Sequence, residues 1–507
     1  MAAGAPDDLS LWIERWADFQ PDKPAVHFDD RLITYAELTA QIDRLAGVLS
    51  RDLGVGAGAR VTHLGYNGPD LLALLFACAR LGAILVPLNW RLAEPEHRFM
   101  MRDAGVAAAF VEPDFLEHAS RLRDGLADCR FVAYGPTASG WLSYDDAMAA
   151  APGDAPRTGD HNAPLMLVYT SGTTGQPKGA VLTQKALFWN AVNAVHANDL
   201  VNGDHVLTNI PMFHVGGMNI QTVPALHVGA SLTLHRRFDP DLTFDDIARQ
   251  RPTLTVLVPA MMQAMVRHPR WAEADLSSLR GIHTGSSPVP DALIQPFLDK
   301  GVPMGQIYGA TETAPIAIYL RFQDRIAPKG SCGKPAIHCA VRVVDEAGHD
   351  CGPGKRGEIL VSGGNLFSEY WGRAEDTAAV LRDGWFHTGD VGHRDDDGFY
   401  YVDDRKKDVV ISGGENIYPA ELENVLADCP DILEAAVIGL PDERWGEIAV
   451  AMVVLRADAA LDAAAILALF EGRLARFKHP RRVIFVDTLP RNAMGKVKKF
   501  ELRAKLH

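Results

Sequence analysis

The sequence predicts an α/β protein, with a large N-terminal part built on mostly parallel, helix-covered sheets and a small α+β part after it. Between residues 60 and 131, short apolar strands alternate with helical segments, which is the pattern of repeated βαβ units. With 507 residues the chain is too long for one ordinary core, so more than one folding unit is expected. At residues 403–408 the run Asp-Asp-Arg-Lys-Lys-Asp interrupts the pattern with dense charge, which indicates a solvated linker.

The elements of the first part follow from apolar periodicity and from capping chemistry. Thr34 precedes a periodic apolar segment and Glu37 follows three residues later, so a capping box is expected to open a helix over residues 35–53. The apolar stretch 71–88 contains an arginine, a glycine and a proline, so it predicts a buried helix and a buried strand rather than a membrane span. Further elements are expected at residues 12–19 (helix), 25–28 and 32–34 (hairpin), 60–64 (strand) and 463–474 (helix).

Composition and charge describe a globular protein and exclude some classes of partner. Hydrophobic residues make up 47% and charged residues 22% of the chain, and the net charge is −14. That charge argues against nucleic acid and anionic membranes as partners, although local positive groups could still hold a small anion. The six cysteines are scattered without a Cys-x-x-Cys pair, and the N-terminus lacks the basic start and apolar core of a signal peptide. We therefore expect reduced thiols and a cytoplasmic protein with no integral membrane segment.

The most informative stretch is residues 170–179, Thr-Ser-Gly-Thr-Thr-Gly-Gln-Pro-Lys-Gly, which stands between two predicted strands. Its glycines let backbone N–H groups turn toward an anion, its hydroxyls add neutral donors, and Lys178 adds a mobile positive charge. This is the chemistry of a polyphosphate site. The P-loop pattern does not fit, because it requires Gly-x-x-x-x-Gly-Lys-Ser/Thr at the start of a helix. A flexible Ser/Thr/Gly hairpin is the alternative for such a composition.

Two segments at predicted strand ends could form the walls of a site. Residues 211–217, Pro-Met-Phe-His-Val-Gly-Gly, combine apolar groups that shape a wall with His214 and with glycines that leave depth. A core histidine followed by a turn is the alternative. Residues 281–288, Gly-Ile-His-Thr-Gly-Ser-Ser-Pro, are small enough for a flat aromatic base to lie on the backbone, and a plain loop is the alternative there.

Two further segments carry groups suited to a nucleotide. In residues 306–312, Gln-Ile-Tyr-Gly-Ala-Thr-Glu, Tyr308 offers a face for stacking and Glu312 an oxygen ligand of the kind that Mg²⁺ prefers. A solvated surface glutamate would not account for the neighbouring tyrosine, glycine and threonine. Residues 385–390 end in Asp390 after a glycine, and such a carboxylate can accept hydrogen bonds from two ribose hydroxyls.

Residues 352–357, Gly-Pro-Gly-Lys-Arg-Gly, match the Gly-x-Gly-x-x-Gly pattern of dinucleotide-binding proteins. The residues that follow, 358–361, predict a strand rather than the helix that such a site requires. Dinucleotide binding is therefore not expected, and the segment predicts a tight turn.

Residues 170–179 resemble the signature loop of the adenylate-forming (ANL) superfamily, which includes acyl- and aryl-CoA synthetases, peptide-synthetase adenylation domains and beetle luciferases. The resemblance extends from about Thr34 to the C-terminus, and the later motifs follow in the expected order. Within the α/β class it implies a large N-terminal adenylation domain, residues 1–404, that includes a distorted β-barrel-like subdomain. A hinge at residues 405–408 and a small mobile α+β domain over residues 409–507 would follow.

The resemblance implies roles for the residues of the matching motifs. The ATP-binding residues would be Thr170, Ser171, Gly172, Thr173, Thr174, Gly175, Lys178, Gly285, Ser286, Ser287, Tyr308, Gly309, Thr311, Asp390, Arg405 and Lys496. The acyl pocket would be lined by His214 as its gate, Val215, Gly216, Gly217, Met218, Thr284, Gly309, Ala310 and Ala314. CoA would contact Gly413, Gly414, Glu415, Trp445, Phe477 and Lys478, and the hinge would turn at Lys407. The catalytic residues would be Lys496, His214, Glu312 and Lys178, with Glu312 as the ligand of Mg²⁺.

The resemblance also implies the reaction, that of an AMP-forming acyl/aryl-CoA ligase with ATP, Mg²⁺ and CoA. The carboxylate of the acid would attack the α-phosphate of ATP and release pyrophosphate, and the thiol of CoA would then take the acyl group and release AMP. Lys496 would neutralise the two anions that meet in the first step. A turn at the hinge would then replace it with the loop at residues 413–416. A homodimer is expected from the family alone.

The acid itself is less well defined. Residues 213–218 and 310–315 carry no charge apart from Glu312, which predicts an acid with an uncharged tail. A medium- or long-chain fatty acid and an aryl acid of the benzoate or cinnamate type both fit. Two other functions also remain open, namely an acyl-AMP ligase that charges an acyl-carrier protein and a luciferase-like enzyme that oxidises the adenylate.

Overall fold

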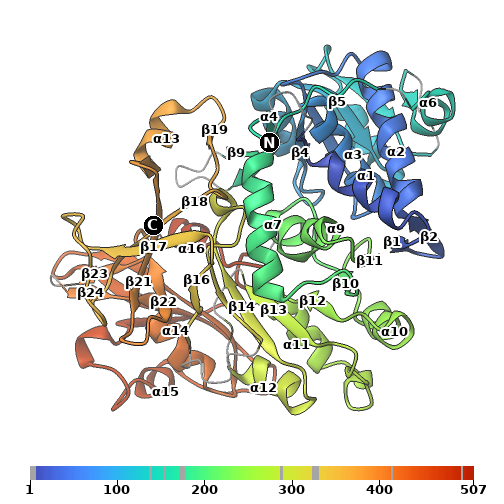
Figure 1. Cartoon of the computed structure of the whole chain (residues 1–507). Helices are drawn as coiled ribbons and strands as arrows, with labels where there is room; N and C mark the ends of the chain where they lie inside the picture. The colour runs from blue at the N-terminus through green and yellow to red at the C-terminus, as the bar shows by residue number, and fades with distance from the viewer. Residues whose placement is uncertain are drawn as a thin grey trace.

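The computed structural model describes residues 7–506 apart from several short segments. Residues 136, 138–139, 154, 171–176, 286–288, 290, 323–329, 413–414 and 493–494 are not described, nor are the side chains of Asp291 and Ala292. Among the described residues the strands form four sheets, of eight, nine, five and five strands. Figure 1 shows the chain passing from the blue N-terminal lobe through the green and yellow middle to the orange and red C-terminal part.

The eight-stranded sheet forms the N-terminal lobe. Its strands in spatial order are β19 (Glu369–Tyr370), β9 (Lys178–Thr183), β8 (Pro164–Thr170), β4 (Ile84–Pro87), β3 (Arg60–Leu64), β5 (Val106–Val111), β6 (Arg130–Ala133) and β7 (Leu142–Ser143). The strands from β8 to β7 are parallel, whereas β9 is antiparallel to β8 and β19 is antiparallel to β9. The strands predicted on either side of residues 171–176 are confirmed, and the structure shows that they pair with each other in one sheet.

The nine-stranded sheet occupies the middle of the molecule. Its strands in spatial order are β16 (Lys334–Pro335), β15 (Ile318–Leu320), β14 (Met304–Tyr308), β13 (Gly281–Gly285), β12 (Leu254–Val256), β10 (His205–Thr208), β11 (Ser231–Leu234), β1 (Pro24–Phe28) and β2 (Arg31–Thr34). The strands from β14 to β1 are parallel and the three outer strands are antiparallel. The hairpin of β1 and β2 confirms the prediction for residues 25–34.

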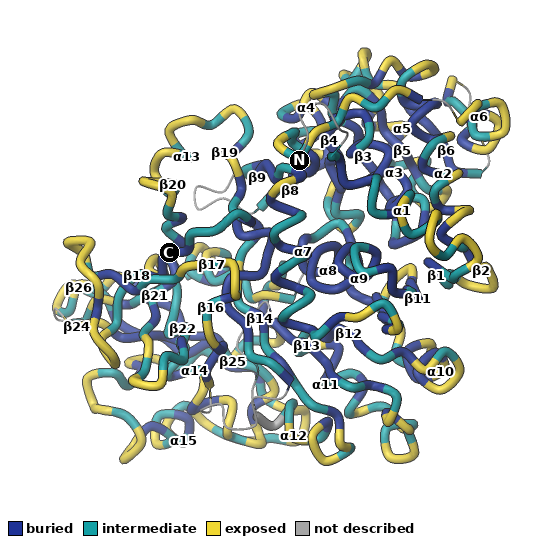
Figure 2. Tube along the Cα trace, in the orientation of Figure 1, coloured by how far each residue is buried: buried dark blue, intermediate teal, exposed yellow. Residues whose placement is uncertain are grey.

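Helices cover the two large sheets and separate them. They are α1 (Ser10–Phe19), α2 (Tyr35–Gly47), α3 (Pro69–Leu81), α4 (Glu94–Ala104), α5 (Leu116–Leu122), α6 (Tyr144–Ala150), α7 (Gln184–Asn198), α8 (Val215–Gly217), α9 (Val223–His227), α10 (Pro240–Gln250), α11 (Pro259–Val266) and α12 (Asp291–Asp299). Helix α3 is buried on nearly every face, because its own side chains are leucine, alanine and phenylalanine almost all the way round. This confirms the predicted buried helix. Figure 2 shows the dark blue buried trace running through the centres of both lobes, with exposed turns at the periphery.

The local predictions hold at helix starts better than at helix ends. Thr34 Oγ1 accepts the Glu37 N–H at 3.2 Å and the Glu37 carboxylate accepts the Thr34 N–H at 2.8 Å, which confirms the capping box. Helix α2 then ends at Gly47 and continues as a π-helical turn, Val48–Asp52. The helix predicted for residues 463–474 is wrong beyond α15 (Ala463–Ala468), because the next backbone bonds reach back three residues and Gly472 adopts φ +72°.

A five-stranded sheet curls beside the nine-stranded sheet as a half-barrel. It contains β17 (Cys339–Val344), β18 (Gly357–Gly363), β21 (Trp385–Arg394), β20 (Leu381–Arg382) and β22 (Tyr400–Arg405), with the exposed helix α13 (Ala374–Val380) between β19 and β20. Its antiparallel pairing rests on a small apolar cluster that includes Ile359, Val361 and Tyr400. Because β18 follows residues 352–357 directly, the Gly-x-Gly-x-x-Gly segment is a turn before a strand, as predicted.

The residues after 409 form a sheet and cores of their own. The strands are β23 (Val410–Ser412), β24 (Glu415–Ile417), β25 (Ile432–Asp442), β26 (Gly446–Leu455) and β27 (Arg482–Phe485), and the helices are α14 (Pro419–Ala427), α15 and α16 (Lys499–Ala504). A long hairpin of β25 and β26 is covered by apolar side chains on both faces. These sheets and helices confirm the predicted α/β class with a small α+β part after it.

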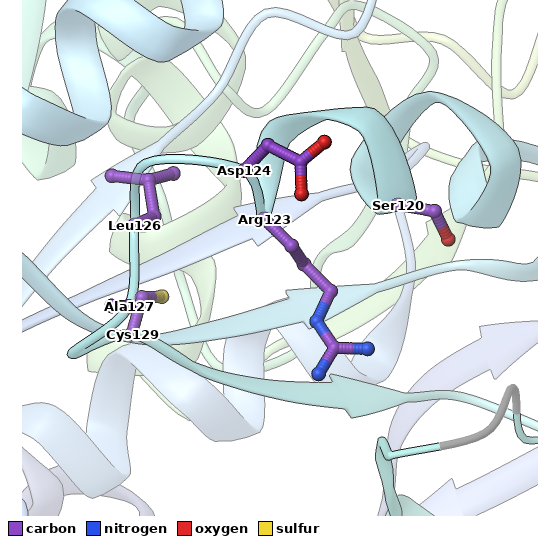
Figure 3. Close-up of a pocket in the computed structure, with 6 residues that line it drawn as sticks. All are labelled: Ser120, Arg123, Asp124, Leu126, Ala127 and Cys129. Atoms are coloured by element: carbon purple, nitrogen blue, oxygen red, sulfur yellow. The ribbon is translucent and has the colours of Figure 1, made fainter.

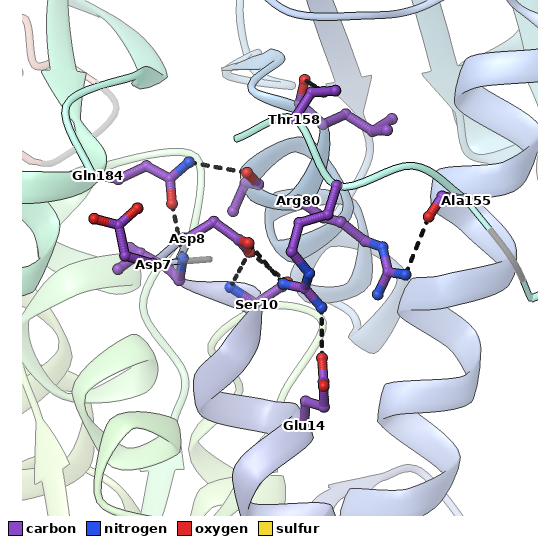
Figure 4. Close-up of polar contacts among 12 residues, drawn as sticks. Asp7, Asp8, Ser10, Glu14, Arg80, Ala155, Thr158 and Gln184 are labelled. Atoms are coloured by element: carbon purple, nitrogen blue, oxygen red, sulfur yellow. Dashed lines mark hydrogen bonds and ion pairs between the residues drawn. The ribbon is translucent and has the colours of Figure 1, made fainter. Parts of the chain in front are cut away.

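A buried ionic network fastens the N-terminal segment to the chain that leads into β8. Asp8 is 1% exposed, and its carboxylate lies 2.6 Å from Arg157, which also pairs with Glu14 of α1. The Leu9 N–H donates to Gln184 Oε1 at 2.7 Å, so the start of α7 joins the same group. Figure 4 shows these contacts converging between α1, α3 and the segment around residue 157.

Candidate active site

The predicted site residues gather at the carboxyl ends of parallel strands. Because β10, β12, β13 and β14 are parallel, these ends lie along one edge of the nine-stranded sheet. Ligands of open α/β sheets bind at such an edge, where the loops that follow successive strands converge. The residues found there are His214 after β10, Thr284 and Gly285 at the end of β13, Tyr308 at the end of β14, and Thr311 and Glu312 in the next turn.

Tyr308, Asp390 and Arg405 form one connected polar group. Strand pairing sets Asp390 of β21 opposite Arg405 of β22, and Arg405 Nε lies 2.6 Å from Asp390 Oδ1. Tyr308 donates its hydroxyl to Asp390 Oδ2 at 2.8 Å. Burial, and after it the Asp390 charge, raises the pKa of Tyr308, and the Asp390 carboxylate raises the pKa of Arg405. A neutral phenol, a carboxylate and a guanidinium therefore lie together at neutral pH.

Glu312 and Lys178 both interact with Tyr370, a residue that the sequence did not single out. Tyr370 donates its hydroxyl to Glu312 Oε1 at 2.6 Å, and the Lys178 ammonium lies 5.6 Å from the centre of the same ring. Burial, followed by the Glu312 charge, raises the pKa of Tyr370, so the phenol stays a donor. Lys178 Nζ also forms a 2.6 Å ion pair with Asp376 Oδ1. Thr170 pairs with Lys178 across β8 and β9, so the chain enters and leaves residues 171–176 at one point.

Lys496 reaches the same region from the other end of the chain. Its backbone N–H donates to Asn492 Oδ1 at 2.9 Å and its carbonyl accepts the Asn492 N–H at 2.8 Å, which closes a tight turn with Gly495 at φ +78°. Although the residue keeps an exposed surface, loss of water around the ammonium and the nearby Arg405 charge lower the pKa of Lys496, while Asp390 acts in the opposite direction. The structure thus brings Lys496 within electrostatic range of the Asp390–Arg405 pair.

His214 stands at the start of α8 as a neutral imidazole. Its Nδ1 accepts the Gly216 N–H at 3.0 Å, which leaves the ring proton on Nε2. Burial lowers the pKa of His214 to about 4. A Cβ on Gly217 would lie 2.1 Å from the Pro211 carbonyl oxygen, so close backbone packing requires this glycine and fills the space beside it.

The other predicted acyl-pocket residues differ in exposure. Val215 and Met218 are fully buried in the main core, whereas Gly309 is exposed. A Cβ on Gly309 would lie 1.5 Å from the Pro315 carbonyl oxygen, so a glycine is required there as well. Ala314 has φ +62°, a left-handed conformation that residues other than glycine rarely adopt. The remaining members are Gly216, which is buried, and Ala310, which is half-buried.

Among the buried polar side chains that have no hydrogen-bond partner within the described part of the chain, one is a predicted acyl-pocket residue and another directly follows Met218. They are Asn219, both amide atoms of which are unpaired at 1% exposure, and Thr284, whose hydroxyl is unpaired at 2% exposure. Asn219 follows the predicted gate segment, and its carbonyl accepts Asn190 Nδ2 at 2.7 Å. The Asn190 side chain in turn accepts the Ile316 N–H at 3.1 Å. Because an unpaired buried polar group costs about 1–3 kcal/mol, both side chains are candidates for a ligand hydrogen bond.

The predicted CoA contacts that the structure describes lie in the C-terminal part of the chain, one on β24 and the others in turns. They are Glu415 and Phe477, which are exposed, and Trp445 and Lys478, which are half-buried. The Arg481 guanidinium lies 5.1 Å from the centre of the Trp445 ring. Lys478 Nζ is 2.5 Å from Glu421 Oε2, so its charge already has a carboxylate partner. Lys407, the predicted hinge residue, is exposed in the turn after β22.

Several predicted residues lie outside the described part of the chain. They are Ser171, Gly172, Thr173, Thr174, Gly175, Ser286, Ser287, Gly413 and Gly414. Their roles stay predictions, supported only by the positions of the residues on either side.

The described residues contain no cluster of three or more histidine, cysteine, aspartate or glutamate side chains that could hold a metal ion by themselves. Nor does any helix among them have the length and apolar character needed to cross a membrane. A surface hollow of about 350 Å³ lies beside α5, remote in sequence from the predicted site and sharing no residue with it (Figure 3). Its lining residues are Ser120, Arg123, Asp124, Leu126, Ala127 and Cys129.

Sequence reasoning missed Tyr370 and Asp376, which contact two of the predicted site residues. Both contacts join residues far apart in the chain, 58 positions in the case of Tyr370 and Glu312. The only local signal is an aromatic pair before a glycine at residues 370–372, which is common in turns. Strand pairing of β19 with β9 brings them to the site, and no local pattern predicts that pairing.

Comparison with known protein families accounts for most of the chain. The family described as AMP-binding enzyme matches residues 13–371, and the AMP-binding enzyme C-terminal domain matches residues 421–496. The two matches together include β8 to β14 and the turn that carries Lys496, whereas Asp390 and Arg405 lie between the two matched ranges.

Comparison with characterised proteins gives relatives over almost the whole length. The chain is 52% identical to an indoleacetate–CoA ligase of Aromatoleum aromaticum and 43% identical to a feruloyl-CoA synthase of Amycolatopsis sp., with 98% of each chain covered in both cases. Among solved structures, the ATP-bound MatB of Rhodopseudomonas palustris is similar with a TM-score of 0.90, at 32% identity and 98% coverage of both chains.

Proposed function

Because this chain belongs to the AMP-binding enzymes of the adenylate-forming superfamily, in their acyl- and aryl-CoA synthetase branch, we propose that its acid substrate is an aryl acid. It is an AMP-forming acyl/aryl-CoA ligase, which adenylates an acid with ATP and transfers the acyl group to CoA. The proposal concerns which acid it takes and which residues do the chemistry.

The chemical problem of the first step is the meeting of two anions. At 4 Å two unit charges repel by about 1 kcal/mol in water and by several times that amount near a protein surface. Neutralising the carboxylate and the α-phosphate is therefore the main task of the site. We assign this task to Lys496, with Lys178 and the donors of residues 171–175 holding the β- and γ-phosphates.

One observation supports this assignment most strongly. Lys496 lies close enough to Asp390 and Arg405 for their charges to change its pKa, although it stands 106 and 91 positions after them in the chain. We assign the ribose hydroxyls to Asp390, which is 5% exposed and held by Tyr308 and Arg405. Because the α-phosphate of a nucleotide is bonded to its ribose, an ammonium beside the ribose site is close to the α-phosphate.

The donor set at Glu312 fits a magnesium ion. Mg²⁺ in phosphate sites is held by one or two carboxylates together with phosphate oxygens and water. Glu312 offers one oxygen beyond the one that Tyr370 occupies, which suits this mode better than an all-protein cage. When bound, Mg²⁺ would supply positive charge beside the β- and γ-phosphates.

For the second step we propose that the C-terminal part turns relative to the rest. Residues 1–404 would form the adenylation domain, residues 405–408 the hinge around Lys407, and residues 409–507 the moving domain. The turn would withdraw Lys496 and present residues 413–416, with Trp445, Phe477 and Lys478, to CoA.

Three observations support an aryl acid with a hydrogen-bonding group in its ring system. The relatives at 52% and 43% identity are named for indoleacetate and feruloyl substrates, whose rings carry an N–H or an O–H group. The predicted acyl walls carry no charge apart from Glu312. Asn219 and Thr284 add buried polar atoms that have no partner in the described structure, and an aliphatic tail would leave them unsatisfied.

The test is pyrophosphate release with a panel of acids, with and without CoA. We expect indoleacetate and hydroxycinnamates to give the highest kcat/KM, with AMP and an acyl-CoA as products only when CoA is added. Octanoate and palmitate serve as aliphatic controls. A higher kcat/KM for either fatty acid would contradict the aryl assignment, and thioester formation only with a pantetheine-loaded carrier protein would contradict CoA as the thiol.

A further inference from the structure

We propose that Asp376 of helix α13 competes with the triphosphate of ATP for the Lys178 ammonium and so sets the affinity of the site for nucleotides that carry β- and γ-phosphates. The inference rests on the proposed role of Lys178 as a phosphate ligand. It assigns a positioning role to a segment, residues 369–377, that the sequence did not single out; we call this segment the strap.

The ion pair at the centre of the proposal is direct. Lys178 Nζ lies 2.6 Å from Asp376 Oδ1, and the lysine side chain is 16% exposed while the aspartate is 41% exposed. The ammonium also faces the Tyr370 ring, so the strap contacts it with both an anion and an aromatic face. A phosphate that approaches Lys178 must therefore share it with Asp376 or displace the carboxylate.

The strap is held in place by contacts that do not involve Lys178. Tyr370 of β19 pairs with Ala180 of β9, and the Trp371 N–H donates to the Gly179 carbonyl at 2.8 Å. Further along, the Tyr370 N–H donates to Thr377 Oγ1 at 2.9 Å, which ties the first turn of α13 to the strand. These bonds fix the backbone on both sides of Asp376, so its side chain starts from a fixed point beside Lys178.

A second set of bonds anchors the strap to the N-terminal lobe. Arg373 lies 2.9 Å from Asp103 Oδ1, and Trp371 Nε1 donates to the Asp103 carbonyl at 3.1 Å. The remaining oxygen of that carboxylate accepts the Tyr169 hydroxyl at 2.7 Å. In Figures 1 and 2, α13 and β19 project beside β9 as an outlying, largely exposed element, which matches a role at the rim of the site.

The same strap holds the predicted magnesium ligand. Tyr370 donates its hydroxyl to Glu312 Oε1 at 2.6 Å, and the Phe367 N–H just before the strap donates to the Glu312 carbonyl at 2.8 Å. One short segment therefore contacts both the lysine and the carboxylate that would meet the β- and γ-phosphates. This convergence is the reason to assign the Asp376 contact to triphosphate binding rather than to a general surface ion pair.

The chemistry predicts discrimination between nucleotides. Asp376 repels the phosphates and holds the cation that attracts them, so removing its charge frees Lys178 and removes a repulsion. Both effects act on the β- and γ-phosphates and neither acts on AMP, which lacks them. A partly exposed pair of this kind is expected to change the affinity for ATP by roughly three- to tenfold.

The experiment compares Asp376→Asn, Asp376→Glu and Glu375→Gln in the chain of residues 1–507. The Kd of Mg-ATP, Mg-pyrophosphate and AMP is measured for each by titration calorimetry at fixed ionic strength. Glu375 is exposed on the same turn of α13, so its variant controls for a change of net charge alone. Circular dichroism melting of each variant verifies that the fold is retained.

We expect Asp376→Asn to bind ATP and pyrophosphate three- to tenfold more tightly, with an unchanged Kd for AMP, and Asp376→Glu and Glu375→Gln to resemble the parent. Unchanged or weaker ATP binding by Asp376→Asn would overturn the proposal, as would an equal gain from Glu375→Gln. If Lys178→Ala binds ATP as well as the parent does, the proposed role of Lys178 is wrong, and that outcome is distinct from failure of the Asp376 proposal alone.

Discussion

Arg356 and Glu421 form an ion pair between the half-barrel sheet and helix α14 of the C-terminal part. The same guanidinium lies 3.2 Å from Asp403 and 4.3 Å from the centre of the Tyr418 ring. It thus contacts groups on both sides of the predicted hinge at residues 405–408. Arg356 stands in the Gly-x-Gly-x-x-Gly turn at residues 352–357, and its contacts help to hold the orientation in which Lys496 lies near Asp390.

The first prediction concerns the two half-reactions. Arg356→Gln should destabilise the domain orientation in which adenylation takes place, because the partly buried guanidinium that pairs with two carboxylates is lost. We expect acid-dependent ATP–pyrophosphate exchange to fall by roughly three- to tenfold, while transfer of a supplied acyl-adenylate to CoA is retained or faster.

Lys355→Gln is the matched control for this prediction. Lys355 stands in the same turn, but its ammonium lies 3.6 Å from Asp345 within the half-barrel part. Equal losses in both half-reactions for Arg356→Gln, or the same profile for Lys355→Gln, would contradict a role of Arg356 in domain orientation.

The second prediction concerns the charge on Lys496. Lys496→Ala should reduce acyl-adenylate formation by about 10²–10³-fold, the usual cost of removing one preorganised charge from a site of this kind. Loss of water and the Arg405 charge lower the pKa of Lys496, so the ammonium should lose its proton at a pH below that of an ordinary lysine. The rate of adenylation should therefore decline on the alkaline side, and Lys496→Arg should move that decline to higher pH.

The pH profile of pyrophosphate release measures this effect, and the rate of thioester formation from a supplied adenylate is its internal control. If the rate of Lys496→Arg declines at the same alkaline pH as the rate of the parent, the decline is caused by another group. Full adenylation activity of Lys496→Ala would remove the basis of the proposed mechanism.

The features that the sequence predicts correctly are those that depend on residues close together in the chain. The capping box at Thr34 and the strands around residues 171–176 depend on neighbouring residues, so a local pattern predicts them. Asp390 and Arg405 could be predicted separately, but their ion pair depends on the register of β21 with β22. That register is a property of the sheet, and no run of residues specifies it.

The interactions that the sequence did not predict are long-range contacts between ordinary surface residue types. Asp376 and Arg356 belong to charged segments that resemble solvated surface, and only the folded chain places them against Lys178 and Glu421. The role of Gly217 also differs from its prediction. The sequence predicts that this glycine leaves depth for a substrate, whereas in the structure it allows close backbone contact with Pro211.

The third prediction concerns the tail of the acid. Asn219→Leu replaces an amide whose two polar atoms have no partner in the described structure with an apolar group of similar size. In the absence of a ligand this change should stabilise the fold by about 1 kcal/mol, because an unsatisfied buried polar group is removed. If the amide serves the acid, the same variant should lose roughly tenfold in kcat/KM for indoleacetate.

The matched substrate for this test is naphthylacetate, which has a similar ring system without the N–H group. Its kcat/KM should change little or rise in Asn219→Leu. A parallel loss for both acids would indicate that Asn219 shapes the backbone of the gate segment rather than binding the tail.

The fourth prediction concerns stability at acidic pH, and His97 is the clearest contributor. It is fully buried, and its two ring nitrogens lie 2.8 Å from His118 and 2.9 Å from the Asn89 carbonyl. Burial is the main cause that lowers the pKa of His97 to about 4 from the usual value near 6.5. The same cause lowers the pKa of His63 and His283 to about 3.

The sign of the effect follows from proton counting. Between pH 6.5 and pH 4 the unfolded chain binds a proton at His97 and the folded chain does not, so the free energy of unfolding falls as the pH falls. From pH 8 to pH 5, His97 alone should account for a loss of about 2 kcal/mol. The urea midpoint of His97→Gln should therefore fall less between these two pH values than that of the parent, even if the variant is less stable at both. The control is His349→Gln, at a site where the side chain is 81% exposed, and this variant should retain the full pH dependence. A urea midpoint of the parent that does not change between pH 8 and pH 5 would contradict the neutral state assigned to the buried histidines.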